Sequence, residues 1–270
     1  MAVRKVYVDP GHGGSDPGAV GNGVREADVA LAVAVKVADH LRRHGLEVRL
    51  SRTVDTAKSL QARTDEANAW GADAYVSIHC NAAGTPEASG WEVWHTIHEE
   101  RSMGDELAEA IADQLKRLPM VARGTKSKPS TSNPQTDYYH VIRETRMPAV
   151  IVECGFVTSP KDAGYLKSAE GQAAIAEAIA RGVIAWAGLA WRPAEQPKSA
   201  PVPSPAPKAP VKPGPFRDVP GDHWAAVSIE RLKRAGIIEG FADGTFRPDE
   251  PVTRAQLAAI LDRLQSALRK

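Results

Sequence analysis

Two patterns of apolar residues alternate along the first 191 residues of the chain. Short runs rich in apolar residues predict strands at residues 5–9, 46–52, 74–80 and 148–156, and the last of them, PAVIVECGF, is nearly continuously apolar, as suits a strand buried on both faces. Between the first two runs, Val29, Val33 and Val37 recur at helical spacing, and Gly45 stands at the expected C-terminal cap. Helices are predicted at about 27–45, 59–71, 102–118 and 171–186. This alternation favours a three-layer α/β domain with a mostly parallel sheet flanked by helices.

The composition changes abruptly after residue 191. Residues 192–215 read RPAEQPKSAPVPSPAPKAPVKPGP, and this density of proline excludes both helix and sheet. We interpret the segment as a linker between a first domain at 1–191 and a second module at 216–270. In that module, Thr253 and Gln256 have the spacing of a capping box, and amphipathic helices are predicted at about 223–235 and 254–268. The second module is therefore expected to be small and helical.

The charge of the chain is balanced, with 34 Lys and Arg against 33 Asp and Glu in 270 residues, so nucleic acid is not an expected partner. Cys80 and Cys154 are the only cysteines, too few for a disulfide framework, and we expect free thiols. No apolar stretch is long enough to insert into a membrane. The N-terminus leads directly into a strand, so we expect synthesis in the cytoplasm without a signal peptide.

Three of the predicted strands lead to a residue that can bind a metal or transfer a proton: His12, His79 and Glu153. In open α/β sheets, sites form beyond the carboxyl ends of the strands, so these side chains are expected to converge. A catalytic zinc ion is typically held by three protein ligands, such as two imidazoles and a carboxylate, and keeps a fourth position open. Glu26 lies near the same edge, although its plainer interpretation is a favourable charge at a helix N-terminus.

These candidates also have purely structural interpretations. A lone histidine in a glycine-rich turn, as at His12, is more often a surface or capping residue. His79 and Glu153 fit such an interpretation less well, because an unpaired charge at the end of an apolar strand is costly. Asn81 either orients ligands or substrate or belongs to a strand-end turn. Four other histidines lack a comparable setting and are expected to be solvated: His40, His44, His95 and His98.

Three stretches within residues 4–188 carry a family resemblance: VDPGHGGSDPGAVGNGVREADVAL, LSRTVDTAKSLQARTDEANAWGADAYVSIHCNA and RMPAVIVECGFVTSPKDAGYL. Together they resemble the signatures of zinc-dependent N-acetylmuramoyl-L-alanine amidases, the type found in bacterial autolysins and phage endolysins. The resemblance implies one Zn²⁺ ion per catalytic domain, held by His12, Glu26 and His79, with Glu153 as the catalytic carboxylate. It also implies hydrolysis of the amide between the lactyl group of N-acetylmuramic acid and L-alanine in peptidoglycan.

In such an enzyme, the polar segment before the Glu153 strand could form one wall of a groove for the anionic stem peptide. Long polar loops in compact domains are usually functional or disordered. This one carries Arg123, Lys126 and Lys128. Arg123 and Asn81 are therefore the candidate substrate-binding residues.

The motifs FRDV, HWA, GII, GTFRP and TRAQ in residues 216–270 resemble an S-layer homology module. This resemblance implies attachment to a secondary cell-wall polymer, for which Arg254 is the candidate contact. The whole chain is then expected to be a monomer that acts at the bacterial cell wall after its release. Two alternatives stay open: another zinc hydrolase of the wall, such as a carboxypeptidase or deacetylase, and an inactive wall-binding protein.

Overall fold

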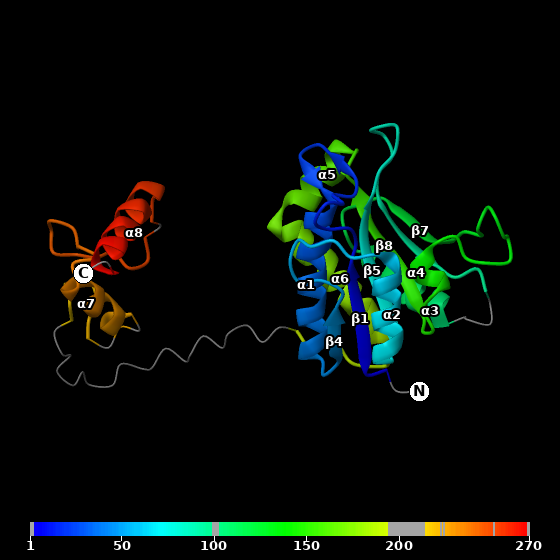
Figure 1. Cartoon of the computed structure of the whole chain (residues 1–270), viewed down its shortest axis with the longest axis horizontal. Coiled ribbons are helices and arrows are strands. Elements are labelled where there is room, and N and C mark those ends of the chain that lie inside the picture. The colour runs from blue at the N-terminus through cyan, green and yellow to red at the C-terminus, as the bar shows by residue number, and fades with distance from the viewer. Residues whose placement is uncertain are drawn as a thin grey trace. The chain divides into compact units, whose positions relative to one another are not determined.

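The chain divides into two compact units, Met1–Ala194 and Glu195–Lys270 (Figure 1). The computed structural model describes residues 3–98, 103–193 and 214–268, except 222, 224 and 251. Most of the predicted linker at 192–215 thus lies outside the described residues. We describe each unit by itself.

The first unit is built on a six-stranded sheet in the order β4-β1-β5-β8-β6-β7. The strands are β1 (Lys5–Pro10), β4 (Glu47–Leu50), β5 (Ala74–Asn81), β6 (Trp91–His95), β7 (Ala122–Ser127) and β8 (Ala149–Phe156). Strands β4, β1, β5 and β8 are parallel, whereas β6 runs antiparallel to β8 and parallel to β7. The expected mostly parallel sheet and the four predicted strands are therefore confirmed.

Helices cover both faces of this sheet (Figure 1). Helices α1 (Glu26–Arg43), α3 (Met103–Leu115) and α6 (Ala169–Trp186) bury their apolar sides in the larger core, against alternate residues of the central strands. Helices α2 (Leu60–Trp70) and α4 (His140–Arg143) lie on the other face, where a smaller core includes Tyr7, Tyr75 and Ile151. The three-layer arrangement follows from these two cores, because strands β1, β5, β8 and β6 supply side chains to both.

Several short elements were not expected from the sequence. They are the hairpin of β2 (Val20–Gly21) and β3 (Val24–Arg25), the strands β6 and β7, and the helices α4 and α5 (Pro160–Lys167). Strand β7 reads ARGTKS, with no residue fully buried, as is common for an edge strand that uses charges to prevent further pairing. Such a strand has no apolar alternation from which it could be predicted.

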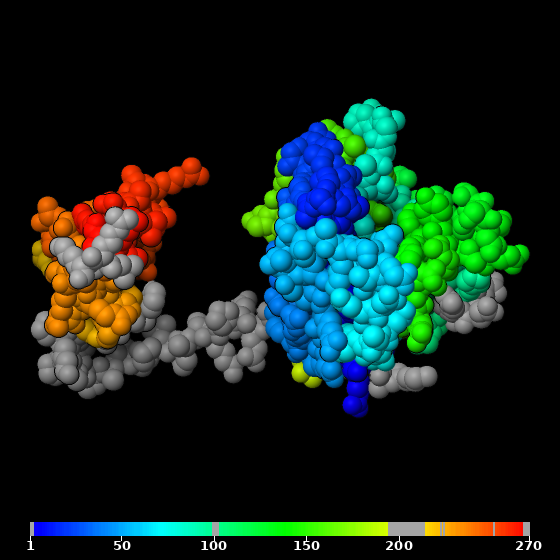
Figure 2. All heavy atoms as spheres, viewed as in Figure 1, coloured from blue at the N-terminus to red at the C-terminus, as the bar shows by residue number. Residues whose placement is uncertain are grey.

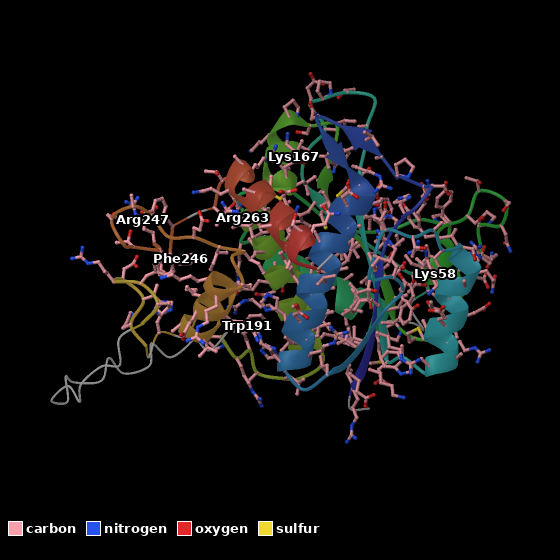
Figure 3. All side chains as sticks on the ribbon, turned by 60° about the vertical axis from the view of Figure 1, so that its left-hand side comes forward. Lys58, Lys167, Trp191, Phe246, Arg247 and Arg263 are labelled. Carbon is pink, nitrogen blue, oxygen red and sulfur yellow. The ribbon has the colours of Figure 1, made fainter. Side chains whose placement is uncertain are left out.

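One of the predictions for the first unit was wrong. His44 is buried, only 6% exposed, although we expected it to be solvated. Its ring stacks on Trp191 at 4.7 Å between centroids, and its Nε2 accepts a hydrogen bond of 2.7 Å from the backbone N–H of Arg192. Trp191 lies beside the C-terminal end of α1 (Figure 3). The ordered part of this unit therefore extends at least through Arg192.

The second unit is small and helical, as expected. It contains α7 (Ala226–Arg234) and α8 (Arg254–Leu268), with a core that includes Val219, Ile229 and Ile237. The predicted capping box is present: Thr253 N–H donates to Gln256 Oε1 at 2.8 Å, and Gln256 N–H donates to Thr253 Oγ1 at 3.2 Å. In the described part of the chain, no helix is long and apolar enough to cross a membrane.

Candidate active site

The three predicted strand ends lie next to one another in the sheet. Strand β5 lies between β1 and β8, and the register places His79 directly beside Glu153. Gly11 N–H donates to the carbonyl of Ile78 at 2.9 Å, so the segment that follows β1 stays alongside β5 and brings His12 toward His79. The rings of the two histidines are 4.9 Å apart. The predicted convergence is confirmed for these residues.

A strained turn directs His12 into the site. His12 itself has a φ of 57°, which is uncommon for a residue with a side chain, and Gly13 follows with a φ of 123°. The turn is closed by hydrogen bonds between the backbones of Gly13 and Asp16. At Gly11, a Cβ atom would overlap the His79 ring, so only glycine lets the two segments approach so closely. In Figure 2 this dark blue segment stands at the surface of the first unit.

Glu26 is the carboxylate between the two histidines. It begins α1, directly after the short hairpin of β2 and β3, and is only 3% exposed. Its Oε1 lies 3.1 Å from His12 Nε2 and 2.9 Å from His79 Nδ1. The backbone N–H groups of Ala19 and Cys80 also donate to this carboxylate, at 2.7 Å and 3.0 Å. Glu26 does stand in the first turn of α1, as the plainer interpretation expected, but its carboxylate is buried against both histidines, which a helix N-terminus alone does not require.

The donor set of these three residues fits a metal ion. Their potential ligand atoms all lie within 4.8 Å of one another. Asp16 Oδ2 lies 2.8 Å from His12 Nδ1. A carboxylate in this position fixes the tautomer of a metal-binding histidine and leaves Nε2 free as the ligand. Although burial opposes it, the hydrogen bonds from the two imidazoles hold the pKa of Glu26 well below its usual range, so this residue is an anionic donor.

Glu153 has a different environment. Its side chain points to the α2 and α4 face of the sheet, as do His79 beside it and Ile151 two residues earlier. Its Oε2 is buried, and among the described residues no group donates a hydrogen bond to it. Burial raises the pKa of Glu153 to about 7; the charges of Glu26 and Glu92 act in the same direction, and His79 opposes them. A buried carboxylate with a free oxygen and this pKa suits a group that takes and returns a proton.

Two buried arginines, which the sequence analysis missed, hold the turn that carries His12. Arg52 donates to the carbonyls of Pro10 and Gly11, and Arg63 donates to the carbonyls of Pro10 and His12, at 2.7–3.1 Å. Arg63 also forms a buried ion pair with Asp9 at 2.6 Å. The sequence did contain one indication that Arg63 is buried. It stands four residues before Ala67, so the two side chains lie on the same, buried side of α2.

Asn81 and Arg123 both contact Glu92, the residue opposite Glu153 in the sheet. The Nδ2 of Asn81 donates to Glu92 at 3.2 Å, and its Oδ1 accepts from the backbone of Ala82 at 2.9 Å. Arg123 on β7 donates to the same Glu92 carboxylate. In the described part of the chain, no hydrogen bond joins Asn81 to His12, Glu26 or His79. Asn81 is the last residue of β5, and its side-chain amide contacts Glu92, a residue that the sequence analysis did not single out.

The remaining predictions concern Cys80, Cys154 and Arg254. The two cysteines are free and buried in the larger core, on the face of the sheet opposite Glu153, as expected. Arg254 is exposed on the first turn of α8. A cavity of about 330 Å³ in the second unit is lined by other residues, among them Phe246, Arg247 and Arg263 (Figure 3). The prediction that Arg254 contacts a wall polymer is not tested by this geometry.

Comparison with known proteins agrees with the site geometry. The family model described as N-acetylmuramoyl-L-alanine amidase matches residues 6–185, which include His12, Glu26, His79 and Glu153. The chain belongs to this amidase family. The model of the S-layer homology domain matches residues 215–258. The two resemblances seen in the sequence are confirmed, and the first unit is an amidase domain.

Individual relatives of the amidase support this assignment. The sporulation-specific N-acetylmuramoyl-L-alanine amidase of Bacillus subtilis is 36% identical over 181 residues, which cover 66% of this chain and 66% of the relative. The amidase CwlM of Bacillus licheniformis is 39% identical over 180 residues, which cover 66% of this chain and 65% of the relative. The structure of the amidase AmiC2 of Nostoc punctiforme matches with a TM-score of 0.61 and 36% identity, over 68% of this chain and 96% of that one.

Proposed function

We propose that this chain is a zinc-dependent peptidoglycan hydrolase, an autolysin or an endolysin. It cleaves the amide between the lactyl group of N-acetylmuramic acid and L-alanine. One observation carries this proposal: Glu153 is half-buried, its Oε2 is buried with no hydrogen-bond partner among the described residues, and it lies beside the His79 of a histidine, glutamate and histidine cluster. This combination provides a metal site and, separately, a group that can transfer protons.

In this proposal, the chain holds one Zn²⁺ ion with His12, Glu26 and His79. The bound ion supplies a Lewis acid for the amide carbonyl and lowers the pKa of water. Asp16 orients the His12 ring through its contact with Nδ1. Arg52 and Arg63 hold the backbone of the turn, so the ligands are in place before the ion and the substrate bind.

Glu153 performs the proton transfers. Its carboxylate takes a proton from the attacking water as the oxygen adds to the carbonyl carbon. It then returns that proton to the nitrogen of L-alanine, so that the amine leaves as the C–N bond breaks. Its raised pKa suits both steps, because the group has to accept the proton and release it again near neutral pH.

The second unit is proposed to anchor the enzyme to the wall. Its match to the S-layer homology domain supports a secondary cell-wall polymer as the partner, with Arg254 as a candidate contact. The two modules are proposed to fold independently as a monomer, with a catalytic domain at 1–191, a linker at 192–215 and a binding module at 216–270. An anchored enzyme meets its insoluble substrate at a higher effective concentration.

Digestion of purified peptidoglycan tests this proposal, with the products identified by mass spectrometry. Free lactyl groups and new L-alanine N-termini are expected. Released D-alanine would instead indicate a carboxypeptidase, released acetate a deacetylase, and unchanged walls a protein that only binds. In the same assay, Glu153→Gln should abolish hydrolysis and keep the zinc content of the wild type, because this residue acts on water and not on the metal.

The matched control for that variant is Glu47→Gln, on the exposed edge of β4. It removes the same charge far from the three ligands and should retain full activity. Turnover by Glu153→Gln, or loss of its metal, would overturn the role given to Glu153.

A further inference from the structure

Glu92 is a buried carboxylate next to the site that the proposed mechanism does not use. It is 2% exposed, and the antiparallel register of β6 and β8 places it directly opposite Glu153. Cross-strand partners point to the same face of a sheet, so His79, Glu153 and Glu92 lie in one row across β5, β8 and β6. A charge at this position faces the same side of the sheet as the catalytic carboxylate.

Two cations from the edge strand β7 share this single carboxylate. Lys126 Nζ donates to Glu92 Oε1 at 2.7 Å, and Arg123 Nε donates to the same oxygen. The side chains of Arg123 and Lys126 are 36% and 31% exposed, whereas that of Glu92 is 3% exposed. The cluster of Arg123, Lys126 and Glu92 therefore carries a net charge of +1, and its two cationic side chains are exposed to solvent whereas its carboxylate is not.

Both cations keep unused hydrogen-bond donors. Within the described ranges, no residue accepts a hydrogen bond from the Nη groups of Arg123, and Glu92 is the one acceptor for Lys126 Nζ. Aromatic rings also hold the two cations: Arg123 lies 5.1 Å from the centre of the Phe156 ring, and Lys126 lies 5.5 Å from that of Trp94. A guanidinium fixed in this way presents a fork that matches a carboxylate.

We infer that Arg123 and Lys126, positioned by Glu92, form an anionic subsite that binds a carboxylate of the stem peptide beside the scissile amide. The inference rests on the proposed function, because it assumes that the peptide side of that amide extends from Glu153 toward β7. His79, Glu153 and Glu92 lie on the adjacent strands β5, β8 and β6, and the next strand, β7, carries Arg123 and Lys126. A peptide that extends across the sheet from Glu153 in this direction would reach the two cations.

Two carboxylates of the stem peptide have the required chemistry. One is the free carboxylate of the acidic residue that follows L-alanine, and the other is the C-terminal carboxylate. Three synthetic muropeptides distinguish them: one with both groups free, one with the first amidated and one with the second amidated. For each we would measure kcat and KM with the zinc-loaded wild type, Lys126→Met, Arg123→Met and the control Lys116→Met. Lys116 directly follows α3 and pairs with Asp113, so its variant removes the same charge elsewhere.

Amidation of one carboxylate should raise the KM of the wild type about tenfold or more, with kcat nearly unchanged, since a charge-assisted contact present throughout the reaction changes binding alone. Lys126→Met and Arg123→Met should lose most of this discrimination, while Lys116→Met keeps it. Equal KM values of the wild type for all three muropeptides would overturn the inference, and so would full discrimination by both variants.

A second measurement separates this inference from the proposed function. If none of the muropeptides is cleaved, the proposed function fails, and calorimetric binding of the same three compounds to Glu153→Gln still decides the inference. Tighter binding of the free carboxylate than of its amide by Glu153→Gln, reduced by the additional change Lys126→Met, would support the subsite. Equal affinities would overturn it.

Discussion

Replacement of Arg63 by methionine should weaken the metal site from a distance. Arg63 does not touch the candidate ion, but its guanidinium donates to the carbonyl of His12 at 2.8 Å and to that of Pro10 at 2.7 Å. It also neutralises Asp9, which is 1% exposed. Methionine fills a similar volume and removes all of these contacts. We expect both the stability of the first unit and its zinc affinity to fall.

The two losses have different magnitudes and different causes. Loss of one partner from a buried ion pair costs about 3–5 kcal/mol, because the other charge is left without a partner. For a unit of this size, that corresponds to a decrease in the melting temperature of about 6–20 °C. A domain stable by roughly 5–15 kcal/mol would in most of this range still be folded at 25 °C. Loss of a residue that supports a metal ligand lowers metal affinity by about 10-fold to 100-fold.

A second change separates the two effects. In Asp9→Asn with Arg63→Met, no charge is left unpaired in the core, and Ser77 can still donate to the side chain at residue 9. Melting temperature should recover in part, whereas zinc affinity, measured by competition with a chelator, should stay low. Arg42→Met, on the exposed side of α1, is the control and should change neither quantity. Wild-type zinc affinity in Arg63→Met, or its return in the double variant, would refute this reasoning.

Four further changes test other parts of the molecule. His79→Ala should lose zinc and activity together, as measured by metal analysis and turnover, and a metal-replete variant would remove His79 from the ligand set. Gly13→Val should lower zinc content in a folded domain, because its φ of 123° and a clash with the Thr56 carbonyl oppose a β-branched side chain; normal zinc content would show that the turn tolerates it. Truncation after Pro193, which retains the contact of Arg192 with His44, should preserve turnover of soluble muropeptides and reduce activity on intact sacculi. Equal co-sedimentation of the truncated and full-length proteins with walls would contradict the anchoring role, and unchanged sedimentation of Arg254→Ala would exclude Arg254 as the contact.

The parts of the site that could be predicted are those that depend on local periodicity. His79 and Glu153 lie on apolar strands, and the period of two in a strand is sufficient to place them opposite Cys80 and Cys154. Their convergence required a single further rule, that parallel strands end at the same edge of a sheet. Neither step needed knowledge of contacts between distant segments.

The position of Glu26 could not be obtained in this way. It depends on a hairpin with only two residues in each strand, Val20–Gly21 and Val24–Arg25, which is too short for any period to be detected. The hairpin brings the chain back so that Ala19 accepts the N–H of Glu26 at 2.9 Å, and α1 then begins beside both histidines. From the sequence alone, a glutamate at a helix start that is buried in a site could not be distinguished from one that is exposed to solvent. From the residues alone Glu26 was the weakest of the candidate ligands, and the family resemblance gave it its main support.

The buried charges show a different limit, and Glu92 illustrates it. Once β6 is known to be a strand, its alternation accounts for Trp91 and Val93 in one core and Glu92 on the opposite face, but it cannot say how that carboxylate is neutralised. Because a buried carboxylate without a cation would be protonated or would destabilise the fold, a partner had to exist somewhere in the chain. The partners lie 31 and 34 residues away, on a strand whose sequence has no strand-like pattern. A charged residue between two buried apolar ones therefore indicates that a neighbouring segment supplies its partner, and here that segment is β7, whose two cations bind Glu92 opposite Glu153.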